Sequence, residues 1–171
     1  MLKAISTLLK LFLSFIVGLS IGLGAIYTHY ANSHKPYTWS AKPIIANCYS
    51  NDLSEEKIKS AFDFWKDQGD EYEFIVMNAP EGICNHDMLH GFILIKKVNN
   101  IPGSALAKTK VEIKFMKIRS AVIYLEPGTY NIQWLLEHEV GHAFGYKHVE
   151  AAGHIMHPYI ELQGGKYWKP K

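Results

Sequence analysis

An α+β fold is predicted for this chain, because three stretches carry clear strand or helix periodicity. Charged and apolar residues alternate within 110–117, as in a strand with one solvated face. Residues 120–125 are apolar on both faces, which is typical of an inner strand beneath a helix. From Leu53 to about Gln68 the apolar residues fall largely on one helical face. Strands and helices within one short chain indicate a mixed domain.

The remaining elements extend this pattern along the chain. We expect four more strands, at 42–49, 72–77, 91–97 and 104–109. Asp52 is the expected N-cap of the first helix, because Glu55 follows three residues later and completes a capping box. The second helix is expected after a turn at 127–129, with Thr129 or Asn131 as its cap.

Composition and charge set bounds on the partners. The 171 residues suffice for one domain with a short appendage. A net charge of +2 names no partner, and no feature supports nucleic-acid binding. Seven basic residues and one acid, Glu112, lie between Lys96 and Arg119. We interpret this run as solvated edge strands blunted by lysine; an anionic substrate or anionic lipid is the alternative.

The N-terminal segment has the pattern of a membrane-directed sequence. Lys3 and Lys10 precede an uncharged stretch, 11–27, which as a helix spans about 25 Å. It is a signal peptide or a signal anchor, and the lack of a good A-x-A cleavage site favours a retained anchor at 1–27. Positive residues before the span place the following chain outside the cytoplasm. We therefore expect a stalk at 28–41 and an extracytoplasmic domain at 42–171, membrane-anchored, or secreted if the segment is cleaved.

One motif carries the chemistry, the stretch from His138 to His148, which reads H-E-x-x-H-x-x-G-x-x-H. His138 and His142 are four residues apart and share one helix face, so both imidazoles can reach one ion. Gly145 falls where the helix should end in a left-handed cap, which lets the reversed chain bring in His148. Three nitrogen ligands with one open position are typical of catalytic zinc. Glu139, on a neighbouring face, can hold a water molecule.

This motif, followed by Met156 in the segment Ile155-Met156-His157-Pro158-Tyr159, resembles that of the metzincin zinc metallopeptidases, most closely the matrixin-like branch, over roughly 42–160. The resemblance implies a mixed, mostly parallel five-stranded sheet with two long helices and a short C-terminal subdomain containing a Met-turn. It also implies Zn²⁺ as cofactor, with His138, His142 and His148 as ligands and Glu139 as general base. Met156 would form a hydrophobic floor, and Pro158, Tyr159 and Ile160 a wall of the substrate pocket.

The function that follows is a zinc-dependent endopeptidase in which Glu139 serves as base to a metal-activated water. The partner expected is an extended peptide or protein paired along an edge strand at 104–109, and the chain is expected to be a monomer. The alternative is a membrane-anchored, zinc-containing module that binds peptides without cutting them. An intact Glu139 favours the enzyme, because a purely structural site has no need of that carboxylate.

Several polar residues outside the motif have open interpretations. Cys48 and Cys84 form one disulfide if the domain is exported, and are otherwise buried small hydrophobes. The histidines His86 and His90 lie in a loop at 78–90, where we favour a polar loop over a second metal site. His154 and His157 flank Met156, but the resemblance supplies three ligands without them.

Overall fold

The computed structural model describes residues 14–18, 34–103 and 105–167. It divides into two compact units, Met1–Pro36 and Tyr37–Lys171. In the first unit, residues 14–18 form an exposed helical segment, and the rest of the predicted membrane segment, 1–27, lies outside the described residues. None of the described helices is both long and apolar enough to cross a bilayer.

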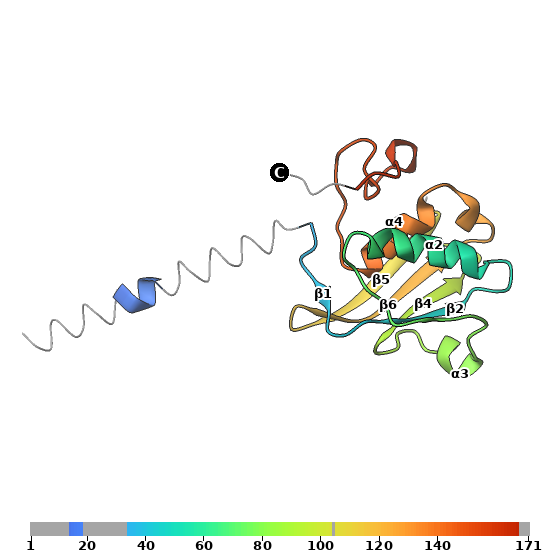
Figure 1. The fold of residues 1–171 in the computed structure, drawn as a ribbon, viewed down its shortest axis with the longest axis horizontal. Coiled ribbons are helices and arrows are strands. Elements are labelled where there is room, and N and C mark those ends of the chain that lie inside the picture. The colour runs from blue at the N-terminus through green and yellow to red at the C-terminus, as the bar shows by residue number, and fades with distance from the viewer. Residues whose placement is uncertain (1–13, 19–33, 104, 168–171) are drawn as a thin grey trace, which may run out of the picture. The chain divides into compact units, whose positions relative to one another are not determined.

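The second unit is built on a six-stranded sheet that is mostly parallel (Figure 1). Its strands are β1 (Thr38–Trp39), β2 (Ile44–Cys48), β3 (Ile75–Val76), β4 (Phe92–Lys97), β5 (Ala107–Lys114) and β6 (Lys117–Leu125). The order is β1-β6-β4-β2-β3, all pairs parallel, while β5 pairs antiparallel with the outer side of β6. The coarse prediction of a mixed α+β fold with a mostly parallel sheet is confirmed.

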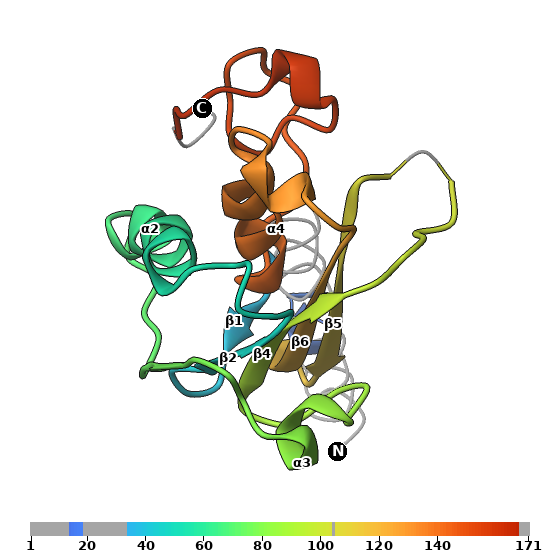
Figure 2. The same cartoon turned by 90° about the vertical axis from the view of Figure 1, so that its right-hand side faces the viewer.

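Helices cover both faces of this sheet unequally (Figure 2). The helices α2 (Glu55–Lys66) and α4 (Leu135–Ala143) lie on one face, and the short α3 (Glu81–Cys84) lies on the other. Two short 3₁₀ helices follow the sheet in the chain: η1 (Thr129–Asn131) precedes α4, and η2 (Ile160–Leu162) comes after it. The helix α4 contacts both α2 and β5, so it is held between the first helix and the edge strand.

Alternation along the strands divides the core in two. The larger core lies beneath α2 and α4 and contains Ile45, Ile93 and Ile123 from the sheet with Phe62 and Trp65 from α2, all fully buried. Alternate residues of the same strands point to the α3 face and form the smaller core, Ala46, Leu94 and Val122. Strand β6 is therefore buried on both faces, as its apolar sequence predicted.

The edge of the sheet differs from the prediction. One continuous strand, β5, replaces the two strands predicted at 104–109 and 110–117, and it begins only at Ala107. Strand β5 is antiparallel to β6 through a two-residue turn, and the pairing extends from Ala107↔Leu125 to Lys114↔Lys117. The register shifts once, between Glu112 and Ile113, where Arg119 of β6 is left as a bulge. A sixth strand, β1, lies within the predicted stalk, so the expected number of five strands was wrong.

Both predicted helix caps were also wrong. Ser54, and not Asp52, caps α2, since the Ser54 hydroxyl accepts a hydrogen bond from the Lys57 amide. Asp52 instead accepts a hydrogen bond from the Ser50 hydroxyl in the preceding turn. The helix α4 begins after Trp134, whose backbone is left-handed at φ 67° and whose side chain makes no capping bond.

Of the two interpretations open for the cysteines, the disulfide is the one present. Cys48 at the end of β2 is bonded to Cys84 at the end of α3, with Cα atoms 5.4 Å apart. The bond ties the small helix to the sheet beside the smaller core, where Ile83 packs.

Candidate metal centre

The site begins with how α4 ends. Gly145 has φ 96°, and the amides of Gly145 and Tyr146 donate to the carbonyls of His142 and Gly141, which is a Schellman cap. A Cβ at position 145 would also lie 2.5 Å from the carbonyl oxygen of Tyr37. Two separate constraints, the backbone angle and the close approach of Tyr37, therefore require glycine at position 145. The left-handed turn predicted there is confirmed.

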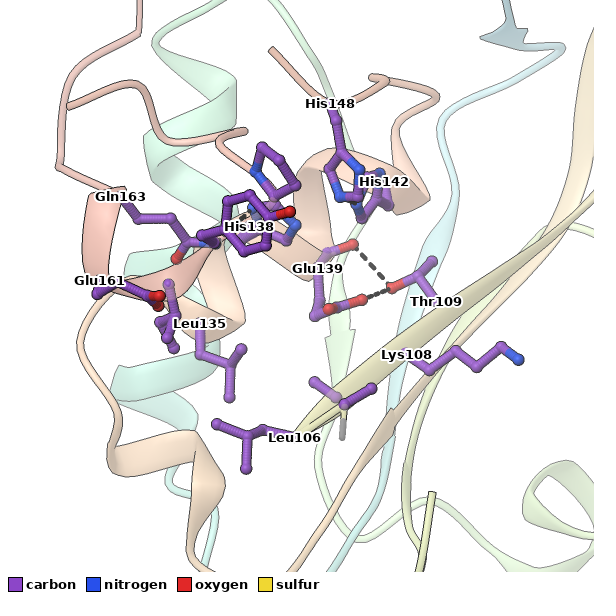
Figure 3. Close-up of a pocket in the computed structure, with 15 residues that line it drawn as sticks. Leu106, Lys108, Thr109, Leu135, His138, Glu139, His142, His148, Glu161 and Gln163 are labelled. Carbon is purple, nitrogen blue, oxygen red and sulfur yellow. Dashed lines mark hydrogen bonds between the residues drawn. The ribbon is translucent and has the colours of Figure 1, made fainter. Parts of the chain in front are cut away.

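This reversal brings the three motif histidines together (Figure 3). One ligand nitrogen from each of His138, His142 and His148 lies within 4.8 Å of the others, and the Nε2 atoms of His142 and His148 are 3.0 Å apart. Nitrogen ligands around tetrahedral zinc are separated by about 3.3 Å. The three side chains are thus close enough to hold one metal ion.

Backbone carbonyls orient two of the three rings. His138 Nδ1 donates to the carbonyl of Ile155 at 2.9 Å, and His142 Nδ1 donates to that of Tyr146 at 2.8 Å. Each bond leaves Nε2 free to accept a metal, the usual support for histidine ligands. Ile155 precedes Met156, so the predicted Met-turn segment positions the first ligand.

The side chain of Tyr146, whose carbonyl accepts the bond from His142, is itself held by a buried polar contact. The Tyr146 hydroxyl donates to Asp70 Oδ2 at 2.8 Å, and its ring stacks on Trp65 with centroids 4.4 Å apart. Trp65 in turn donates its indole proton to the carbonyl of Glu137 on α4 at 2.6 Å. The helix, its reversal and the loop after α2 therefore form one rigid support for His142.

Burial keeps the histidines neutral. Desolvation, with the neighbouring imidazoles, lowers the pKa of His138 to about 3. Desolvation likewise lowers the pKa of His142 to about 4, and burial lowers that of the more exposed His148. Neutral imidazoles are the form that binds metals, so the donor set fits a zinc ion.

Glu139 faces the same space from the adjoining side of α4. Its side chain is 6% exposed, and desolvation raises its pKa to about 7, partly offset by the Thr109 hydroxyl. That hydroxyl lies 2.5 Å from Glu139 Oε2 and 3.0 Å from the Glu139 carbonyl oxygen, and its single proton is shared between them (Figure 3). Thr109 on β5 thus orients a carboxylate that can exchange a proton near neutral pH.

The histidines and Glu139 line a cleft of about 630 Å³. Strand β5 and the segment before it form one wall, and η2 with its preceding residues forms the other. Residues on the walls include Leu106, Ala107, Lys108, Pro158, Tyr159, Ile160, Glu161 and Gln163. Pro158, Tyr159 and Ile160 border the cleft, whereas Met156 is fully buried against α4 and does not line it. The roles implied for these residues toward a substrate stay predictions.

Other histidines in the described ranges do not join this group. His90 Nε2 lies 3.1 Å from Arg119 Nη1, on the α3 side. The rings of His154 and His157 accept hydrogen bonds from the amides of Met156 and Tyr159, and so shape the turn.

Sequence reasoning missed the residues that support the ligands. Thr109 is 30 positions from Glu139, and Asp70 is 76 positions from Tyr146. No local pattern signals either pair, because the sheet and the α2–α4 packing bring them together.

The fold and site define a mixed α+β protein with a three-histidine centre able to hold a metal ion. Comparisons with known protein families and with curated proteins found no match to this chain.

Proposed function

We propose that this chain is a zinc-dependent endopeptidase of metzincin type, resembling the matrixin-like branch. The observation that carries the proposal is the pairing of two features in one cleft: three convergent neutral imidazoles and a buried carboxylate beside them. A site that used zinc only for stability would be closed by a fourth protein ligand. Here the three histidines open onto a cleft of about 630 Å³ that can admit a peptide.

His138, His142 and His148 would hold the zinc ion, which when bound would act as a Lewis acid toward a substrate carbonyl and a water molecule. Glu139 takes a proton from the water as the water oxygen attacks the carbonyl carbon. The C–N bond then breaks, and Glu139 delivers that proton to the departing amine nitrogen. Burial raises the pKa of Glu139 to about 7 in the metal-free protein, and a bound cation would favour its carboxylate form, which is the form that accepts a proton from water.

Strand β5 supports the way a peptide would bind. It is the antiparallel edge of the sheet and borders the cleft through Ala107, Lys108 and Thr109. An extended peptide can pair with such an edge while its side chains alternate toward and away from the cleft. We propose this edge, and not the predicted segment 104–109 as a whole, as the substrate-binding strand.

The setting we propose is extracytoplasmic, with the N-terminal segment as anchor and the catalytic domain acting as a monomer. The Cys48–Cys84 disulfide supports export, because such bonds form in oxidising compartments. Peptides and proteins outside the cytoplasm are then the substrates.

The test compares the zinc-loaded full chain with Glu139→Gln on a mixed peptide library read by mass spectrometry. The variant should keep its zinc content and lose about 10²–10⁴-fold in cleavage rate. Glu137→Gln is the matched control on the same helix, because Glu137 points at Lys57 of α2, and it should cleave normally. Undiminished cleavage by zinc-bound Glu139→Gln would refute the mechanism. Zinc-bound wild type that binds peptides without cutting them would establish the non-catalytic module instead.

A further inference from the structure

The turn between β5 and β6 exposes two large apolar side chains. Lys114 pairs with Lys117, so Phe115 and Met116 are the two central residues of a tight hairpin turn. Phe115 is 84% exposed and Met116 is 47% exposed. Neither belongs to the two apolar cores, so the fold gains little from their side chains.

The backbone makes this choice of residues costly. Phe115 has φ 51° and Met116 has φ 63°, the left-handed pair of a type I′ turn. Asn and Gly adopt this conformation readily, whereas bulky residues are rare in it. A hairpin that needed only to close would be better served by Asn-Gly. Strain of this kind occurs where a surface has a function.

The hairpin around the turn is strongly basic. Residues 107–119 carry five basic side chains and one acid: Lys108, Lys110, Lys114, Lys117, Arg119 and Glu112. Glu112 is occupied by the Ser120 hydroxyl. Within the described ranges, none of the five basic residues forms an ion pair with a carboxylate. Lys110, Lys114 and Lys117 are exposed, so their charge is available to an external anionic surface near the turn. Lys108 lines the cleft at the far end of β5, and Arg119 is half-buried beside His90.

The chain enters the domain beside this turn. Thr38 of β1 pairs with Lys117, and Lys117 Nζ donates to the Thr38 hydroxyl at 2.9 Å, so β1 and the hairpin turn lie together (Figure 1). The predicted membrane segment ends at residue 27, and residues 28–37 can span at most about 35 Å. If segment 1–27 is the anchor proposed above, on which this argument rests, a tether of that reach limits how far the start of β1 can lie from the bilayer.

We propose that the β5–β6 turn docks on an anionic lipid bilayer, with Phe115 and Met116 inserted among the lipids and the surrounding lysines on the headgroups. Apolar residues that enter the interface, flanked by basic residues, are the combination that binds such surfaces. The cleft borders the opposite end of β5, since Thr109 precedes Phe115 by six residues, about 20 Å along a strand. Docking would thus keep the cleft clear of the headgroups.

The experiment labels the full chain with an environment-sensitive fluorophore at Met116→Cys, which is selective because Cys48 and Cys84 are bonded to each other. Vesicles of phosphatidylcholine with phosphatidylserine are compared with vesicles of phosphatidylcholine alone. Emission should shift to the blue and be quenched by nitroxide-labelled lipid only with the anionic vesicles. Glu56→Cys, exposed at the start of α2, is the matched control position and should show no shift.

Two further variants separate docking from folding. Phe115→Asn suits the left-handed turn, so it should keep or raise the melting temperature while weakening the shift at residue 116. The double variant Lys114→Gln, Lys117→Gln should also weaken the blue shift at residue 116, and added salt should weaken it in the wild type. If the chain binds the vesicles but the fluorophore at position 116 keeps the emission that it has in water, the proposal is overturned. An equal blue shift with neutral lipid would overturn it as well. A shift that grows with protein concentration without vesicles would assign the turn to a second copy of the chain instead.

Discussion

Gly141 of α4 lies directly against the Sδ atom of Met156, so closely that a Cβ at position 141 would overlap it. The same Cβ would also overlap the ring of Trp65. Gly141 lies between His138 and His142 in the sequence, and its missing side chain is what lets the segment around Met156 and helix α2 pack against α4. The motif leaves position 141 unspecified, and packing requires glycine there.

We predict that Gly141→Ala destabilises the protein by about 1–3 kcal/mol, because overpacking a filled core forces neighbours to move. Gly82→Ala is the matched control. Gly82 is also helical, but nothing lies within 4 Å of an added Cβ there, so stability should be kept or slightly raised. Chemical denaturation of the two variants checks this. Equal stability of Gly141→Ala and wild type would mean that Met156 and Trp65 are free to move away.

The three-ligand centre predicts which histidine replacements remove metal. His148→Ala should lower zinc affinity by at least about tenfold, since it deletes one of three ligands. His86→Ala should leave the affinity unchanged, because His86 lies in the loop after α3 and outside the histidine group. Competition with a chromophoric chelator measures both. If His148→Ala binds one zinc ion per chain as tightly as wild type does, His148 is not a ligand or another group replaces it.

The metal centre was predictable because its geometry is local. The spacing of His138 and His142 follows from the helix, and the position of His148 follows from the left-handed turn at Gly145. Burial on both faces likewise identified β6 from its composition alone. These features depend on residues within about ten positions of each other in the chain, where periodicity is informative.

What the sequence did not reveal depends on long-range packing. The strand predicted at 72–77 shrinks to Ile75–Val76, because it lies at the end of the sheet and pairs only with β2 in the described ranges. Trp134 begins α4 without a polar cap, since its ring packs closely against Gly165 from the C-terminal segment. Tertiary contacts override local preference at both positions.

The disulfide supports a further prediction on stability. Replacing Cys48 and Cys84 together by alanine should destabilise the fold by about 2–4 kcal/mol, because the bond closes a loop of 36 residues in the unfolded chain. Helix α3 lies on the sheet face opposite α4, which carries His138 and His142, so zinc binding by the folded variant should be retained (Figure 2). Denaturation and zinc titration of the double variant measure the two effects separately. Loss of zinc affinity from a variant that is still folded would show that the two faces of the sheet are coupled.

Glu139 and its histidine neighbours give the metal-free protein a stability that depends on pH in two opposing ways. The pKa of Glu139 is about 7 in the fold and near 4.5 when unfolded, so the fold favours the protonated form and loses stability as pH rises from 4.5 through 7. The pKa values of His138 and His142 fall to about 3 and about 4 from 6.5, so their contribution is full above pH 6.5 and is lost on acidification.

Glu139→Gln should separate these contributions. At pH 8 the metal-free variant should be more stable than wild type by about 1–3 kcal/mol, because it no longer buries an ionised carboxylate. Below pH 4.5 that advantage should disappear, since Glu139 is then protonated in both states, while acidification from pH 6.5 destabilises both proteins. Urea denaturation across this range in the presence of a chelator tests the sign. Added zinc should narrow the gap at pH 8, because a nearby cation favours the carboxylate; a gap independent of both pH and zinc would place Glu139 outside the centre.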